Sequence, residues 1–213
     1  MDGNHFTLFV AQGIAKPADL KGKSIGVTRV GATTWVFARL LAKHQGWNPD
    51  RDVKIVPLGG VDAQLAALSR GEIAGFVWGD GGAAFEAEGK GKVLVRLDTV
   101  TPKWISQIAM ASEEGIKKNP DAIRRSLRGV FRAIKFMKEN PAEAARILSP
   151  KLSWSEAAIK RAHQNSGPLL PADGRFSLEN FKVMQDTLLD QGILKKRVPL
   201  EQHYTTDFVP VRL

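Results

Sequence analysis

Short runs of apolar and β-branched residues recur through the first half of the chain, separated by amphipathic stretches with helical spacing. Five runs predict strands, at 6–11, 24–28, 53–58, 73–78 and 93–97. Two of the intervening stretches, 35–41 and 61–69, predict helices, and glycine follows each of them as a helix end. Because strands that alternate with single helices are typical of a parallel sheet, we predict a parallel α/β unit at 18–100.

The second half of the chain carries mostly helical patterns. After a predicted strand at 105–111, helices are expected from Pro120, from Pro141, at 153–165 and at 177–191. The helix from Pro120 has an apolar stripe that we predict to be buried, made of Ile123, Leu127, Val130, Phe131 and Ile134. The strands at 6–11 and 105–111 flank the α/β unit, so we expect two crossings between two lobes, a hinge, and a ligand crevice between the lobes.

Length and composition exclude several classes of protein. The chain has 213 residues, enough for one domain or two small lobes, and its 43% hydrophobic and 25% charged residues are typical of globular proteins. The absence of cysteine excludes disulfides, thiolate metal sites and cysteine nucleophiles. The four histidines, His5, His44, His163 and His203, have no metal-ligand spacing, so we expect no metal. No apolar run approaches the ~18 residues of a membrane span, and residues 1–5 do not resemble a secretory signal.

The charge balance favours an anionic partner. The formal net charge is +9, and residues 101–213 contribute +7 of it, with 19 basic and 12 acidic residues. A basic stripe on the helix from Pro120 is one candidate for nucleic-acid contact, formed by Arg124, Arg128, Arg132 and Lys135. A solvated helix face explains the same stripe more simply, so we expect no nucleic-acid partner.

The strongest candidate for an anion site is the turn that joins the strand at 24–28 to the next helix. It contains Gly31, Ala32, Thr33 and Thr34. Free backbone N–H groups and the helix dipole favour negative charge at a helix N-terminus, and the two threonines add hydroxyl donors. The alternative is ordinary helix capping.

Two further turns follow strands in the same way. Gly59 and Gly60 open the helix at 61–69 and would let the backbone approach a ligand, although a tight turn explains them equally well. Trp78 could stack on a ligand, and Asp80 could accept a hydrogen bond from an amine or amide. The alternative places Trp78 in the core and makes Asp80 a helix cap.

The third turn also satisfies G-x-G-x-x-A, at Gly79, Gly81 and Ala84, with Asp98 after the next strand. A dinucleotide-binding enzyme domain is therefore an alternative, but glycines at 89 and 91 leave only a short helix. The chain has no G-x-x-x-x-G-K-[ST], G-x-S-x-G or H-E-x-x-H motif. We expect a binding protein with no catalytic residue and no cofactor.

Several segments, taken together, resemble a known family. Residues 17–27 (PADLKGKSIGV), 62–73 (DAQLAALSRGEI), 119–121 (NPD), 140–145 (NPAEAA) and 191–194 (QGIL) resemble, in order, motifs of ABC-transporter solute-binding proteins. The most similar group binds nitrate, sulfonates and taurine, and it includes proteins that bind precursors of the thiamine pyrimidine.

This resemblance implies a two-lobed type II periplasmic-binding fold in the α/β class. One complete α/β lobe would span residues 12–102, and residues 1–11 and 103–213 would form hinge crossings and an incomplete, helix-rich second lobe. The implied function is binding of a small anionic or zwitterionic ligand, similar to a sulfonate, nitrate, taurine or pyrimidine. The implied partner is an ABC permease in the membrane, and the implied location is the periplasm or another extracytoplasmic space.

The family's signal peptide and opening β-α-β-α segment have no counterpart here, so we expect self-association through the incomplete lobe. Two alternatives share the fold. The effector domain of a LysR-type regulator would be cytosolic and fits the helical second half poorly. An enzyme that builds the thiamine pyrimidine would need a histidine in the cleft, and none of the four histidines lies in the three turns.

Overall fold

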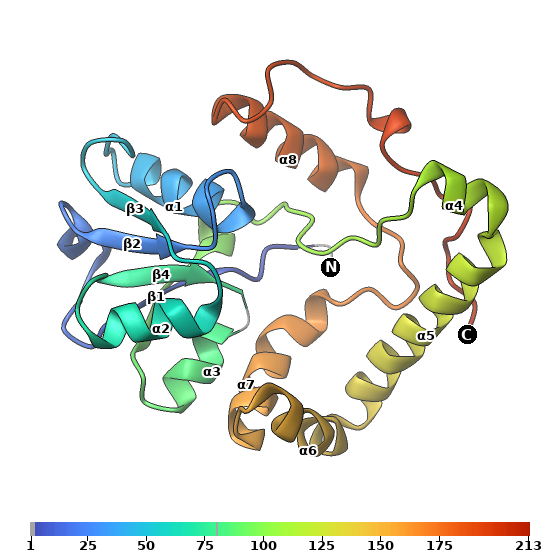
Figure 1. The fold of residues 1–213 in the computed structure, drawn as a ribbon, viewed down its shortest axis with the longest axis horizontal. Coiled ribbons are helices and arrows are strands. Elements are labelled where there is room, and N and C mark those ends of the chain that lie inside the picture. The colour runs from blue at the N-terminus through green and yellow to red at the C-terminus, as the bar shows by residue number, and fades with distance from the viewer. Residues whose placement is uncertain (1–2, 80) are drawn as a thin grey trace.

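A computed structural model describes residues 3–79 and 81–213 and shows a mixed α/β fold (Figure 1). Its sheet has the strand order β3-β2-β4-β1-β5. The strands are β1 (Thr7–Val10), β2 (Ser24–Val27), β3 (Lys54–Pro57), β4 (Gly75–Trp78) and β5 (Lys92–Arg96). β2 runs parallel to β3 and β4, whereas β1 is antiparallel to β4 and β5.

The strands predicted within 18–100 (β2, β3, β4 and β5) all run in one direction, as expected of a parallel unit. β1, which was expected to lie outside that unit, also joins the sheet. This strand is inserted between β4 and β5 and enters the sheet in the opposite direction. The domain boundaries at residues 12 and 102 stay a prediction, but Thr7–Val10, which they assign to the helical part, pairs within the sheet.

Alternating side chains of β1 point to the two faces of the sheet, as the strand repeat of two residues requires. Leu8 and Val10 belong to one core cluster, with Phe37 and Leu41 of α1 (Thr33–His44). Phe9 belongs to the other cluster, which includes residues of α2 (Val61–Ser69) and α3 (Gly81–Ala87). Because helices cover both faces, every residue of β1 is buried.

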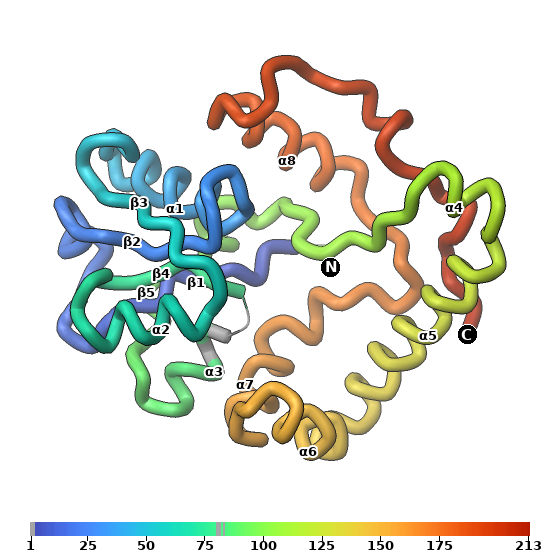
Figure 2. Tube along the Cα trace, viewed as in Figure 1, coloured from blue at the N-terminus to red at the C-terminus, as the bar shows by residue number. Residues whose placement is uncertain are grey.

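The remaining helices lead away from the sheet and back to it (Figures 1 and 2). They are α4 (Glu113–Lys118), α5 (Pro120–Glu139), α6 (Pro141–Leu152), α7 (Glu156–Ser166) and α8 (Leu178–Asp190). α7 packs against α3 and α6. α8 lies beside α1, where Lys43 Nζ is 2.8 Å from Asp190 Oδ2. No described helix is long and apolar enough to cross a bilayer.

Two expectations for the second half are corrected. Residues 105–111 contain only an isolated bridge at Ile105, because the described part of the chain offers them no longer strand to pair with. In the predicted buried stripe of α5 only Phe131 is buried, and Val130 is 54% exposed. α5 packs mainly against α4 and α6, and Ile123, Leu127 and Ile134 are half-buried, so the stripe is only partly covered.

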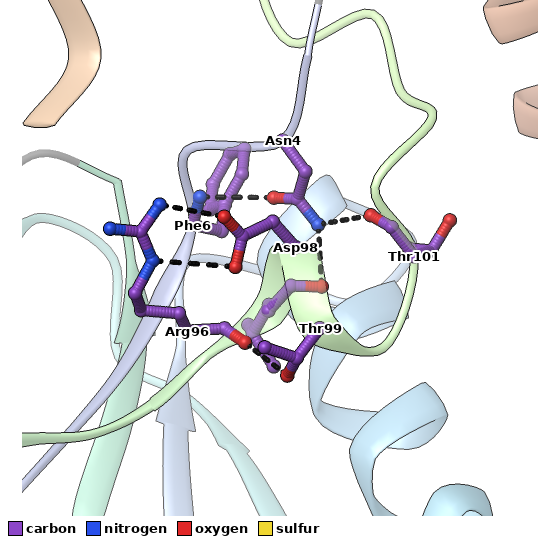
Figure 3. A network of polar contacts seen from close by, with 7 residues as sticks. Asn4, Phe6, Arg96, Asp98, Thr99 and Thr101 are labelled. Atoms are coloured by element: carbon purple, nitrogen blue, oxygen red, sulfur yellow. Dashed lines mark hydrogen bonds and ion pairs between the residues drawn. The ribbon is translucent and has the colours of Figure 1, made fainter.

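The segments before β1 and after β5 run side by side. Ser106 Oγ donates to the carbonyl oxygen of Gly3 at 2.5 Å. Asn4 Nδ2 donates to the carbonyl oxygens of Leu97 and Thr101, both at 2.9 Å (Figure 3). These bonds hold the start of the chain against the segment that leads from β5 to the helices.

Candidate functional site

A cleft of about 690 Å³ lies between the carboxyl ends of β2 and β4 and the helices α5, α6 and α7. The turn after β2 supplies most of its polar wall, with Ser106 and Gln107 beside it. The helical side is mainly apolar, with Met137, Leu148, Leu152, Trp154, Ile159, Ala162 and Leu170. The cleft thus has one polar and one apolar side, at the strand ends where ligands of α/β sheets bind.

The turn after β2 is held by two threonines. The Thr28 N–H donates to Thr34 Oγ1 at 3.0 Å, and the two hydroxyl oxygens are 2.8 Å apart. The Thr34 residue is only 5% exposed, so its hydroxyl is already engaged inside the protein. Thr34 was predicted from the sequence as a ligand donor, whereas Thr28, which fixes the turn that presents the other groups, was not predicted.

The N-terminus of α1 opens onto the cleft. Ala32 is the N-cap residue and offers no side-chain hydrogen bond, so its side chain leaves the first-turn N–H groups uncapped. Ala32, Thr33 and Thr34 all line the cleft. Thr33 is half-buried, and no protein partner of its hydroxyl is seen among the described residues. The start of the helix therefore offers N–H and hydroxyl groups that can donate hydrogen bonds to an anion.

Arg29 gives this end of the cleft a formal positive charge. It lines the cleft, is exposed, and makes no ion pair with any described residue. None of the lining residues that the structure describes is an aspartate or glutamate. The positive charge and the helix dipole act in the same direction here, so this wall favours an anion.

The other predicted turns contribute unequally. Trp78 ends β4 and lines the cleft. Gly31, Gly59 and Gly60 are not among the described lining residues. Gly59 has a φ of +81°, and its N–H donates to the carbonyl of Thr28 at 3.0 Å, so it positions the first turn. Asp80 lies outside the described residues.

Two histidines from outside the three turns also line the cleft. His163 comes from α7, and His5 comes from the segment before β1. Burial lowers the pKa of His5 from its ordinary value of 6.5 to about 4. The sequence does not reveal His5 as a cleft residue, because its position depends on the insertion of β1 between β4 and β5, for which there is no local signal.

Two kinds of cofactor site, a metal site and a dinucleotide site, can be compared with the described residues. Among the described residues, no three histidine, aspartate or glutamate side chains lie together as metal ligands. The helix of the G-x-G-x-x-A segment spans only Gly81–Ala87, as expected, and Asp98 Oδ2 pairs with Arg96 Nη2 at 2.6 Å. This segment therefore lacks the long helix and the free acidic residue of a dinucleotide site.

Curated relatives of the chain are binding proteins. A binding protein of Brucella abortus is 25% identical over 207 residues, covering 92% of this chain and 64% of its own length. The taurine-binding periplasmic protein of Escherichia coli is 40% identical over 89 residues, 41% of this chain and 27% of the relative. The chain therefore spans a little under two thirds of the length of the relative that it matches over most of its own length.

Solved structures share the fold. The alkanesulfonate-binding protein SsuA of Xanthomonas axonopodis pv. citri, bound to MOPS, matches with a TM-score of 0.76 at 18% identity, over 93% of this chain and 68% of that one. The desulfurization enzyme DszB matches with a TM-score of 0.63 at 16% identity, over 97% and 75% of the chains. The fold is thus that of periplasmic binding proteins, and an enzyme also has it. The family model described as NMT1/THI5 like matches residues 3–144, more than half of the sequence, and the chain belongs to this family.

Proposed function

We propose that this protein is the solute-binding component of an ABC importer and holds a small organic anion in the cleft. The observation that carries the proposal is the polar wall, where Arg29 and the uncapped N-terminus of α1 face a cavity without a described carboxylate. The charge of the wall complements a sulfonate or a similar oxyanion. The sulfonate and taurine proteins among its relatives support the same ligand class.

The apolar lining of the cleft indicates what the uncharged part of the ligand is. Met137, Leu148 and Ile159 present aliphatic groups and Trp154 presents a ring, and on the sheet side Trp78 adds a second ring. These side chains suit an alkyl or flat organic body, whereas a bare inorganic ion would leave them without contacts. We therefore favour an organic anion over nitrate.

The proposed partner is a membrane permease, and the proposed location is outside the cytoplasm. Both proposals rest on the names of the relatives, which include a periplasmic protein. Binding without chemistry is proposed because the family consists mainly of binding proteins, although DszB shows that the fold also supports an enzyme.

Isothermal titration calorimetry with taurine, ethanesulfonate, hexanesulfonate, nitrate and an aminopyrimidine tests the proposal. We expect an alkanesulfonate or taurine to bind, and mass spectrometry should recover it unchanged. Replacing Arg29 by glutamine should weaken binding about ten- to hundredfold, because a charge-assisted interaction is lost. Arg125, an exposed arginine of α5 outside the cleft lining, is the matched control. Absence of binding by every anion would refute the proposal, and a chemically altered ligand would indicate an enzyme.

A further inference from the structure

His5 lies at the boundary between two cavities. It lines the cleft and also a second cavity of about 290 Å³ on the β5 side of the sheet. Its ring packs on Phe6, with the two ring centroids 4.6 Å apart. The glycine at 79 makes room for it, since a Cβ at that position would lie 2.7 Å from His5 Nε2. The imidazole is thus held in place by packing on two sides.

The two ring nitrogens of His5 have different surroundings. Nδ1 is buried and has no hydrogen-bond partner among the described residues. Nε2 lies beside Gly79, which lines both cavities. An N–H group buried without an acceptor is costlier than an unpaired lone pair, so the proton belongs on Nε2. Burial also disfavours the charged imidazolium, and the lowered pKa of His5 agrees with a neutral ring.

We propose that His5 is a further ligand-recognition residue, which donates an uncharged hydrogen bond from Nε2 to an anionic oxygen of the ligand. This inference rests on the proposed function. A neutral donor adds directional recognition without the desolvation penalty of a second buried cation. It also discriminates against ligands that present only a donor at this point, because two donors would then face each other.

The two described carboxylates that line a cavity with His5 both have a donor partner already. Arg29 and His163 share the cleft with His5. In the second cavity, Asp98 is paired with Arg96, and Glu86 Oε1 accepts from the Val93 N–H at 2.9 Å. Arg161, from α7, adds another positive charge to that cavity. The positive charges of Arg29 and Arg161 favour an anionic oxygen of a ligand beside the Nε2–H.

The test compares two variants with opposite hydrogen-bonding ability, using the alkanesulfonate that the wild type binds most tightly. His5→Phe keeps a ring and loses the donor, so its dissociation constant should rise about ten- to hundredfold. His5→Gln keeps an N–H donor and should recover most of the affinity. His44→Phe is the matched control, since His44 is exposed at the end of α1 and lies outside the cleft lining. Equal affinities of wild type and His5→Phe would overturn the inference.

A second measurement applies to the unmodified protein and does not depend on the folding of a variant. Nitrogen-15 NMR of the histidine rings should show His5 as the neutral tautomer protonated at Nε2, and its signal should shift on sulfonate binding. A neutral tautomer protonated at Nδ1, or an unchanged Nε2 signal at saturation, would overturn the inference. A wild type that binds no anion in the calorimetric panel would instead refute the proposed function, so the two failures are distinguishable.

Discussion

The side-chain amide of Asn4 donates a hydrogen bond of 2.9 Å to the carbonyl oxygen of Thr101, across 97 positions of sequence. The same nitrogen donates to Leu97, and Asn4 Oδ1 accepts from the Phe6 N–H at 3.0 Å (Figure 3). Asn4 is only 3% exposed, so these three hydrogen bonds satisfy a buried side-chain amide. It joins the segment before β1 to the segment after β5, which continues from the sheet into the helical half.

Replacing Asn4 by alanine should lower the free energy of unfolding by about 1–3 kcal/mol, because a buried network loses its shared partner. Chemical denaturation measures the change. Thr101→Ala is a suitable control, since the bond uses the backbone carbonyl of Thr101, and we expect it to stay within about 0.5 kcal/mol of wild type. Equal stabilities of Asn4→Ala and wild type would contradict this role of the side chain.

The two threonines at the start of α1 should respond differently to substitution by valine. Thr34→Val removes the acceptor of the Thr28 N–H and should lower the free energy of unfolding by about 1–3 kcal/mol. Thr33 faces the cleft, so Thr33→Val should weaken sulfonate binding about tenfold or more, with little loss of stability.

Denaturation and calorimetry on both variants separate the two roles. If Thr33→Val bound the sulfonate as tightly as the wild type, its hydroxyl would have no part in recognition. If Thr34→Val were as stable as the wild type, the bond to Thr28 would contribute nothing measurable.

The sequence predicted those helices and turns whose limits are set by residues nearby in the chain. The helix at Val61–Ser69 has its predicted bounds, because Gly60 and Gly71 flank an amphipathic run. The same local reasoning placed the start of α1 beside the end of β2. It therefore also predicted that Ala32, Thr33 and Thr34 would lie together at a strand end, where the structure places the cleft.

Features that depend on distant partners could not be predicted in this way. The pattern at 105–111 resembles a strand, but a strand needs a neighbour, and the described chain supplies only a bridge at Ile105. The direction of β1 and the position of His5 both follow from strand order, which hydrophobic periodicity does not encode. The Thr28–Thr34 bond spans only six residues, and the threonine at the strand end is the signal that could have revealed it.

Stability should fall as the pH is lowered through the titration range of His5. Its folded-state pKa, about 4, lies below the ordinary value of 6.5, so between these values the unfolded chain binds more protons. This destabilisation by His5 is absent above pH ~6.5 and grows as the pH falls toward ~4. It lowers the free energy of unfolding by no more than about 3 kcal/mol.

Comparing the wild type with His5→Phe isolates this contribution from the carboxylates that also titrate at low pH. As the pH falls from 6.5 to 4, the wild type should lose more unfolding free energy than His5→Phe, which has no imidazole to protonate at this position. A difference that is independent of pH over this range would show that His5 titrates alike in the folded and unfolded chain.

Exposed apolar side chains on α5 and on the segment before α4 predict self-association. Ile108 is 63% exposed, Met110 is 86% exposed and Val130 is 54% exposed. Because exposed apolar surface favours association, sedimentation velocity should show a concentration-dependent rise in mass. Replacing Ile108 and Met110 together by serine should reduce association and leave the melting temperature nearly unchanged, since neither side chain is buried. A wild type that stays monomeric at high concentration would show that this surface does not bind a second copy.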